Sequence, residues 1–125
     1  MKYDTALFST VRAGMPQGTY PEMYDGTTFK LFPFDEAPQG TEPPYAVYQL
    51  ITGTPENTLN CPPNAVFITE QVDIYTDNPL QVSYIFDAMS AAIADIGYVT
   101  GINQSSRDEE TRRYRISFDV AIWSI

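Results

Sequence analysis

The chain contains no histidine, and this absence excludes several kinds of chemistry. Ser-His-Asp and Cys-His triads need an imidazole base, and His-ligated metal sites need an imidazole ligand. Cys61 is the single cysteine, so no disulfide forms within the chain and a reducing compartment is its natural setting. Without a base to generate a thiolate, we expect Cys61 to be an ordinary thiol in a loop.

Positive charge is also scarce. Seven Lys and Arg residues face 16 Asp and Glu residues, which gives a net charge of -9 at pH 7. This balance argues against a broad basic surface for nucleic acid or for an anionic membrane. No stretch approaches the roughly 18 apolar residues of a membrane span, and the first residues lack the apolar core of a signal peptide. We therefore expect a protein that is made and used in the cytosol.

The 125 residues are 43% hydrophobic, which predicts one globular domain spanning residues 1–125. Hydrophobic periodicity predicts helices over residues 3–13 and 79–96, and strands over 27–34, 45–52, 65–76, 98–104 and 112–124. The fold class is therefore α+β, with a mostly antiparallel sheet of four or five strands and two helices on one face. The last two strands form a C-terminal β-hairpin whose polar tip is 105–110.

Two boundaries and one long loop complete this prediction. Asn78 and Pro79 suit the start of the second helix, and Gly97 suits a left-handed C-cap at its end. Residues 14–44 hold six of the ten prolines, so we expect an extended loop or arm interrupted by one short strand. Pro33 would confine that strand to a sheet edge or a strand end.

Aromatic and charged residues supply the candidate contact sites. Tyr20 and Tyr24 lie in the loop region and suit protein–protein contact, although they would equally pack the loops onto the sheet. Trp123 points to the outer side of the last strand, where it is either an interface anchor or part of a second small core. The hairpin tip favours a solvated surface over a cation site. Its charged residues, which we include among the candidate assembly contacts, are Arg107, Asp108, Glu109, Glu110 and Arg112.

Glu70 interrupts the apolar face of the strand at 65–76. Three interpretations remain open. The carboxylate lies beyond the part of the sheet that the helix covers, it pairs with an arginine, or it is a lone catalytic group. No phosphate loop, dinucleotide fingerprint or nucleophile elbow accompanies it.

Three stretches resemble a known family: PPYAVYQLI at 43–51, the strand and helix at 71–97, and RRYRISFDVAIW at 112–123. They are similar to the tail terminator, or tail completion, proteins of long-tailed bacteriophages of the siphophage, lambda-like type. The resemblance implies a hexameric ring on the head-proximal end of the tail tube. Such a ring stops tube polymerisation and then presents a surface for head joining.

The resemblance also sets the expected partners and place. The partners would be other copies of the chain, the tail tube protein and a head completion or connector protein. DNA would pass through the lumen without specific binding, and neither an enzyme activity nor a cofactor or metal is implied. The protein would be a virion component assembled in the host cytoplasm. The alternatives are another neck or head–tail joining protein, or a small cytosolic α+β domain with a ligand pocket or enzymatic site.

Overall fold

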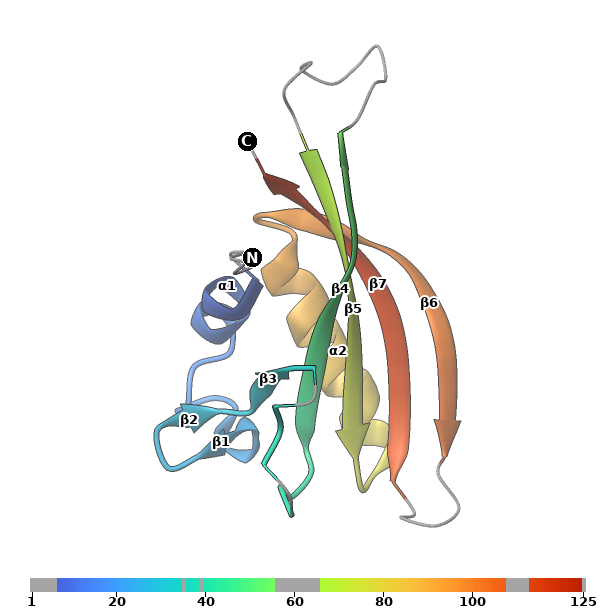
Figure 1. The fold of residues 1–125 in the computed structure, drawn as a ribbon. Helices are drawn as coiled ribbons and strands as arrows, with labels where there is room; N and C mark the ends of the chain where they lie inside the picture. Colours follow the sequence, from blue (N-terminus) through green and yellow to red (C-terminus); the bar gives the residue numbers. More distant parts are fainter. Residues whose placement is uncertain (1–6, 35, 39, 56–65, 108–112, 125) are drawn as a thin grey trace.

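The computed structural model describes residues 7–34, 36–38, 40–55, 66–107 and 113–124. The elements in chain order are α1 Leu7–Gly14, the 3₁₀ helix η1 Pro21–Met23, β1 Tyr24–Asp25, β2 Thr28–Phe29, β3 Leu31–Pro33, β4 Tyr45–Pro55, β5 Val66–Thr76, α2 Pro79–Ile93, β6 Gly97–Arg107 and β7 Tyr114–Ser124. Five of the described strands form one sheet in the order β3-β4-β5-β7-β6, and β1 pairs with β2 in a separate small sheet (Figure 1).

The main sheet is antiparallel except for the parallel pair of β3 and β4. The α+β class, the five strands and the C-terminal hairpin of β6 and β7 are therefore confirmed. Figure 1 shows four long strands, β4, β5, β7 and β6, twisting strongly around one another.

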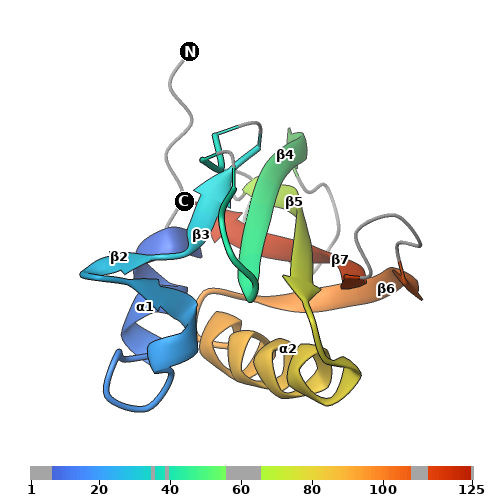
Figure 2. The ribbon, with the colours of Figure 1, turned by 90° about the horizontal axis from the view of Figure 1, so that it is seen from below.

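One face of the sheet is covered and the other is open. Along β5, Val72 and Ile74 are buried, while Gln71 and Asp73, which alternate with them, are half-buried, and this is the alternation that the sequence predicts. Helix α2 packs against β5, β6 and β7 on the apolar face, and α1 lies beside α2 (Figure 2). Ile85, Met89 and other apolar residues of α2 complete the core.

Helix α2 begins as expected and ends differently. The Asn78 side chain accepts a hydrogen bond from the backbone N–H of Leu80 at 2.8 Å, and Pro79 occupies the first turn. Gly97 is not a left-handed C-cap, because the helix ends at Ile93 and Gly97 is the first residue of β6. The glycines with positive φ among the described residues are Gly26 and Gly40.

The segment from 14 to 44 holds more regular structure than expected. The strand predicted over 27–34 is split into β2 and β3 by Lys30, whose N–H donates to Met23 and whose carbonyl accepts from Ala46. The chain thus leaves the small sheet and enters the main one at this residue. Pro33 does lie in an edge strand, as predicted.

Other boundaries shift by a few residues. The first helix is described from Leu7, so the start of the predicted range 3–13 lies outside the described residues. Strand β4 runs to Pro55, three residues beyond the predicted strand end at 52. Strand β6 runs to Arg107, so residues 105–107 belong to a strand rather than to the hairpin tip. The remainder of that tip lies outside the described residues.

Candidate assembly surfaces

Tyr24 anchors the N-terminal segment internally. Its hydroxyl donates to the backbone carbonyl of Met15 at 2.8 Å, and its ring lies 5.1 Å from that of Phe29. Met15 and Phe29 are both buried. Tyr24 is therefore half-buried against the core, and its predicted role in assembly stays a prediction.

Tyr20 joins the same segment to the outside of α2. Its ring packs against that of Tyr84 with centroids 5.4 Å apart. Leu80, one turn before Tyr84, is 80% exposed. Tyr20, Leu80 and Tyr84 form an aromatic and aliphatic patch, which we call the α2 patch. Tyr20 could be predicted as a contact residue from the sequence, but its neighbours Leu80 and Tyr84 could not, because they look like ordinary positions of an amphipathic helix.

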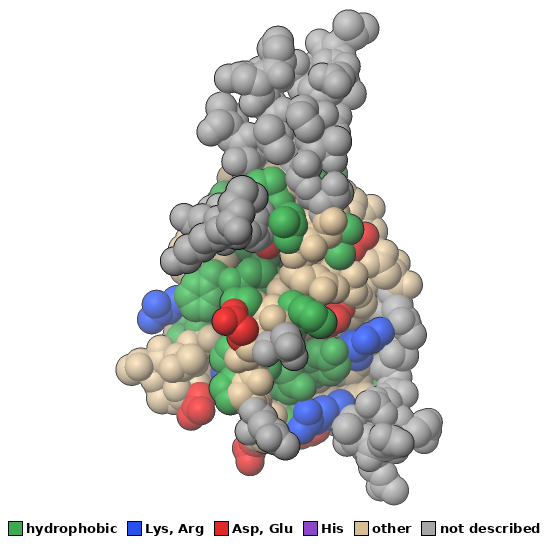
Figure 3. Space-filling view, viewed as in Figure 1, with side chains coloured by type: hydrophobic (Ala, Val, Ile, Leu, Met, Phe, Trp, Pro, Cys, Tyr) green, Lys and Arg blue, Asp and Glu red, His purple; other side chains and the backbone are tan. Residues whose placement is uncertain are grey.

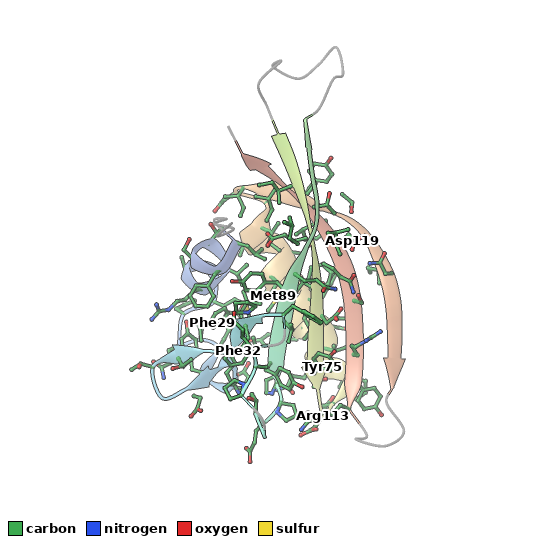
Figure 4. All side chains as sticks on the ribbon, viewed as in Figure 1. Phe29, Phe32, Tyr75, Met89, Arg113 and Asp119 are labelled. Carbon is green, nitrogen blue, oxygen red and sulfur yellow. The ribbon has the colours of Figure 1, made fainter. Side chains whose placement is uncertain are left out.

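The open face of the sheet holds an aromatic and basic cluster where β4 and β7 begin and β5 ends. Tyr45 and Tyr75 are cross-strand neighbours whose rings stack with centroids 5.1 Å apart. Arg113 donates to the Tyr45 hydroxyl at 3.2 Å, and its guanidinium carbon lies 5.7 Å from that ring (Figure 4). This contact combines a hydrogen bond with a cation–π interaction. We call these three residues the Tyr–Arg cluster.

Within the Tyr–Arg cluster, the pKa of the Tyr75 phenol is shifted from its ordinary value. Partial burial raises the pKa of Tyr75, while a hydrogen bond with Arg115 acts in the opposite direction. On this face, Figure 3 shows Lys and Arg side chains close to hydrophobic ones. The cluster places a half-buried cation on the open face of a chain whose net charge is strongly negative. In the sequence, Tyr45 is one of the aromatics beside the Pro/Gly-rich segment that suit protein contact, and alternation places Tyr75 and Arg113 on the outer face of the sheet. No local pattern brings the three residues together.

Farther along the open face the side chains are polar and hydrogen-bonded to one another. Gln71 donates to the Ser117 hydroxyl at 2.9 Å across the β5–β7 pair. Asn103 on β6 donates to the Asp119 carboxylate at 2.8 Å. The open face thus changes from aromatic and basic at one end to neutral and acidic toward the middle.

Glu70 points to the covered face and is fully buried. Its cross-strand neighbours are Leu50 on β4 and Val120 on β7. The carboxylate is therefore not exposed to solvent. Its pairing with an arginine and its role as a lone catalytic group both stay predictions.

Lys30 lines a small recess in the N-terminal region. Its side chain is 7% exposed, and its ammonium donates to the backbone carbonyl of Glu42 at 3.0 Å. Burial lowers the pKa of Lys30, and the nearby carboxylates of Asp25, Glu42 and Glu22 act in the opposite direction. The recess measures about 250 Å³ and includes Thr41. The Lys30 ammonium holds the loop at Glu42 beside the start of β3 through this hydrogen bond, which gives the charge a structural role.

Several predicted contact residues are only partly placed. Arg107 ends β6 opposite Tyr114, and Trp123 pairs with Phe67 across the β7–β5 ladder, with their side chains outside the description. The other tip residues and Cys61 lie outside the described residues, namely Asp108, Glu109, Glu110 and Arg112. Within the described part, no three His, Cys, Asp or Glu side chains gather as metal ligands. None of the described helices has the length and apolar character needed to cross a membrane.

The α2 patch and the Tyr–Arg cluster contain aromatic rings and an arginine, residue types that are enriched at protein–protein interfaces. The family model described as tail completion protein gp17 matches residues 25–124. The chain therefore belongs to the tail completion protein gp17 family and is a structural component of a phage tail that contacts other tail components. No curated protein matches the chain.

Proposed function

We propose that this protein is a tail terminator. Copies of the chain form a ring, a hexamer, on the head-proximal end of the tail tube. The ring stops tube polymerisation and presents the surface to which the head completion or connector protein binds. Membership of the tail completion family carries this proposal. The three stretches that resemble tail terminators belong to the central sheet and to the helix that covers it, namely β4, β5 with α2, and β7.

A ring subunit needs two different surfaces for its neighbours and two more for the tube and the head. The α2 patch and the Tyr–Arg cluster lie on opposite sides of the sheet and differ in chemistry, which suits separate partners. The remaining proposed assembly contacts are Tyr24, Arg107, Asp108, Glu109, Glu110, Arg112 and Trp123.

The excess of carboxylates suits the passage of DNA. Acidic side chains that line the lumen would repel phosphates, so DNA would slide through without binding. Lysine substitutions at lumen positions should slow DNA ejection from virions. Unchanged ejection kinetics would contradict this role for the negative charge.

Electron microscopy of particles made without this gene tests the proposed function. Overlong tails without heads are expected, and wild-type protein supplied in trans should restore normal tails. Tails of normal length beside filled heads would move the protein to a later head–tail joining step. Intact infectious particles would overturn a role in the virion and return attention to the recess at Lys30 as a ligand site.

A further inference from the structure

Two edges of the main sheet pair with no described strand. β6 is the last strand of the sheet, so its outer edge is open along the strand. On the other side, β3 pairs with β4 only at Ala46, Val47 and Tyr48, which leaves the outer edge of β4 open from Gln49 to Pro55. An open edge presents a row of backbone N–H and C=O groups to any strand that approaches.

Charge is absent from the open segment of β4 and from β6 up to its last residue, Arg107. Residues 43–55 and 96–106 contain no Asp, Glu, Lys or Arg, although 18% of the whole chain is charged. Folded proteins commonly protect sheet edges with charged side chains, lysine above all. Here β6 has only register shifts, after Val99 and after Ile102, which bend the strand without closing its edge.

Exposed apolar side chains gather at these same edges. On β4, Leu50 is 42% exposed and Ile51 is 49% exposed, at the start of its open segment. On β6, Tyr98 is 50% exposed and Ile102 is 56% exposed. Large apolar side chains that remain outside the core and cluster in this way mark a contact surface.

We propose that the outer edge of β6 in one copy of this chain pairs with the open segment of β4 in the next copy, so that the sheet continues from subunit to subunit. Each copy carries both edges, one on either side of its main sheet. The same β6–β4 contact can therefore join every copy to the next. Such a head-to-tail contact is heterologous and closes into a ring when the rotation permits. The inference rests on the proposed ring and names the interface within it.

Charge favours a second copy as the occupant. Two chains of net charge -9 repel each other over most of their surfaces. The charge-free edges let two copies approach without bringing carboxylates together. Backbone pairing across them would satisfy the open N–H and C=O groups, and Leu50, Ile51, Tyr98 and Ile102 would become buried at the seam.

Photo-crosslinking in assembled virions tests the pairing directly. A benzoylphenylalanine residue replaces Ile102, and the same residue at Ala13, an exposed position of α1 outside the proposed contact surfaces, serves as the control. Irradiation should join two copies of the chain through Ile102, and mass spectrometry should map the second copy's crosslink to residues 45–55. Crosslinks from position 102 that reach only the tail tube protein, or no other chain, would overturn the proposal.

Purified variants test the direction of the contact. Ile102→Lys blocks the β6 edge and Ile51→Lys blocks the β4 edge, while Ala13→Lys, at an exposed position of α1, is a control outside both edges and outside the α2 patch. In sedimentation velocity each edge variant should be monomeric alone, and an equal mixture of the two should form dimers that grow no further. Self-association of Ile51→Lys alone would instead indicate β6 pairing with β6 and would overturn the head-to-tail arrangement.

The outcomes also separate this inference from the proposed function. A ring that forms with either edge blocked refutes the edge pairing and leaves the terminator role intact. Tails of normal length in the absence of the gene refute the terminator role whatever the crosslinks show. Circular dichroism of each variant confirms that a lost assembly reflects the edge rather than an unfolded chain.

Discussion

A β-carbon placed on Gly97 would lie 1.9 Å from the carbonyl oxygen of Ala121. Gly97 is the first residue of β6 and pairs with Ile122, so the two strands approach closely where the chain leaves the α2 turn. The next nearest atoms are also backbone atoms, the Ala121 carbonyl carbon at 2.9 Å and Ile122 Cα at 3.0 Å. Since backbone atoms cannot rotate away, only glycine fits at this position without a strand displacement.

The substitution Gly97→Ala should therefore destabilise the fold by about 3 kcal/mol, the range of severe overpacking. For a domain of this size that corresponds to a fall in Tm of roughly 10 °C. The matched control is Gly101→Ala on the same strand, where a β-carbon would meet no heavy atom within 4 Å. The control should change stability by less than about 1 kcal/mol. Equal Tm values for the two variants would contradict the close approach.

The long, periodic segments could be predicted from the sequence, and the short ones could not. The strands β5 and β7 could be predicted from the alternation of apolar and polar residues. The start of α2 could be predicted from Asn78, whose side chain accepts a hydrogen bond from a backbone N–H nearby in the chain. Gly97 was misread because a glycine after a helix is compatible with both a left-handed cap and a close strand approach. Only the position of Ala121 decides between them.

For the candidate surfaces, too, single residues could be predicted from the sequence but their contacts could not. Tyr20 and Tyr24 could be singled out as loop aromatics, but their partners Tyr84 and Met15 follow from tertiary packing. In the Tyr–Arg cluster, Tyr45 and Arg113 are 68 positions apart in the chain, so no local sequence pattern predicts their contact. The break at Lys30 likewise depends on a hydrogen bond to Met23 and on the pairing of β3 with β4.

Removal of the Tyr24 hydroxyl distinguishes packing from assembly. In Tyr24→Phe the Met15 carbonyl loses its donor, which should cost about 1 kcal/mol of stability. The ring contact with Phe29 is kept, so phage assembly at permissive temperature should be unchanged. Urea unfolding and complementation of phage lacking the gene measure the two effects. Lost complementation with unchanged stability would instead establish Tyr24 as an assembly contact.

Charge reversal at Arg113 tests whether the Tyr–Arg cluster is a contact surface. Arg113→Glu removes the hydrogen bond and the cation–π contact with Tyr45, which together should contribute about 1 kcal/mol. If a partner binds this face, complementation should fall by far more than the stability loss explains. The control is Arg12→Glu, which reverses an exposed charge on α1. Equal complementation by both variants would exclude the cluster from assembly.

The buried ammonium of Lys30 should leave a signature in the pH dependence of stability. Because burial lowers its pKa in the folded state, the unfolded chain holds this proton at pH values where the folded chain has lost it. Stability then increases with pH in the window between the lowered pKa and the ordinary value of 10.5. Lys30→Met keeps an apolar stem of similar shape and has no proton to lose. The unfolding free energy of wild type minus that of Lys30→Met, from urea titrations between neutral pH and pH 10.5, should therefore rise with pH. Titrating tyrosines such as Tyr75 are present in both proteins and cancel in this difference. A difference that stays flat or falls would show that the Lys30 ammonium is stabilised by its carboxylate neighbours more than it is penalised by burial.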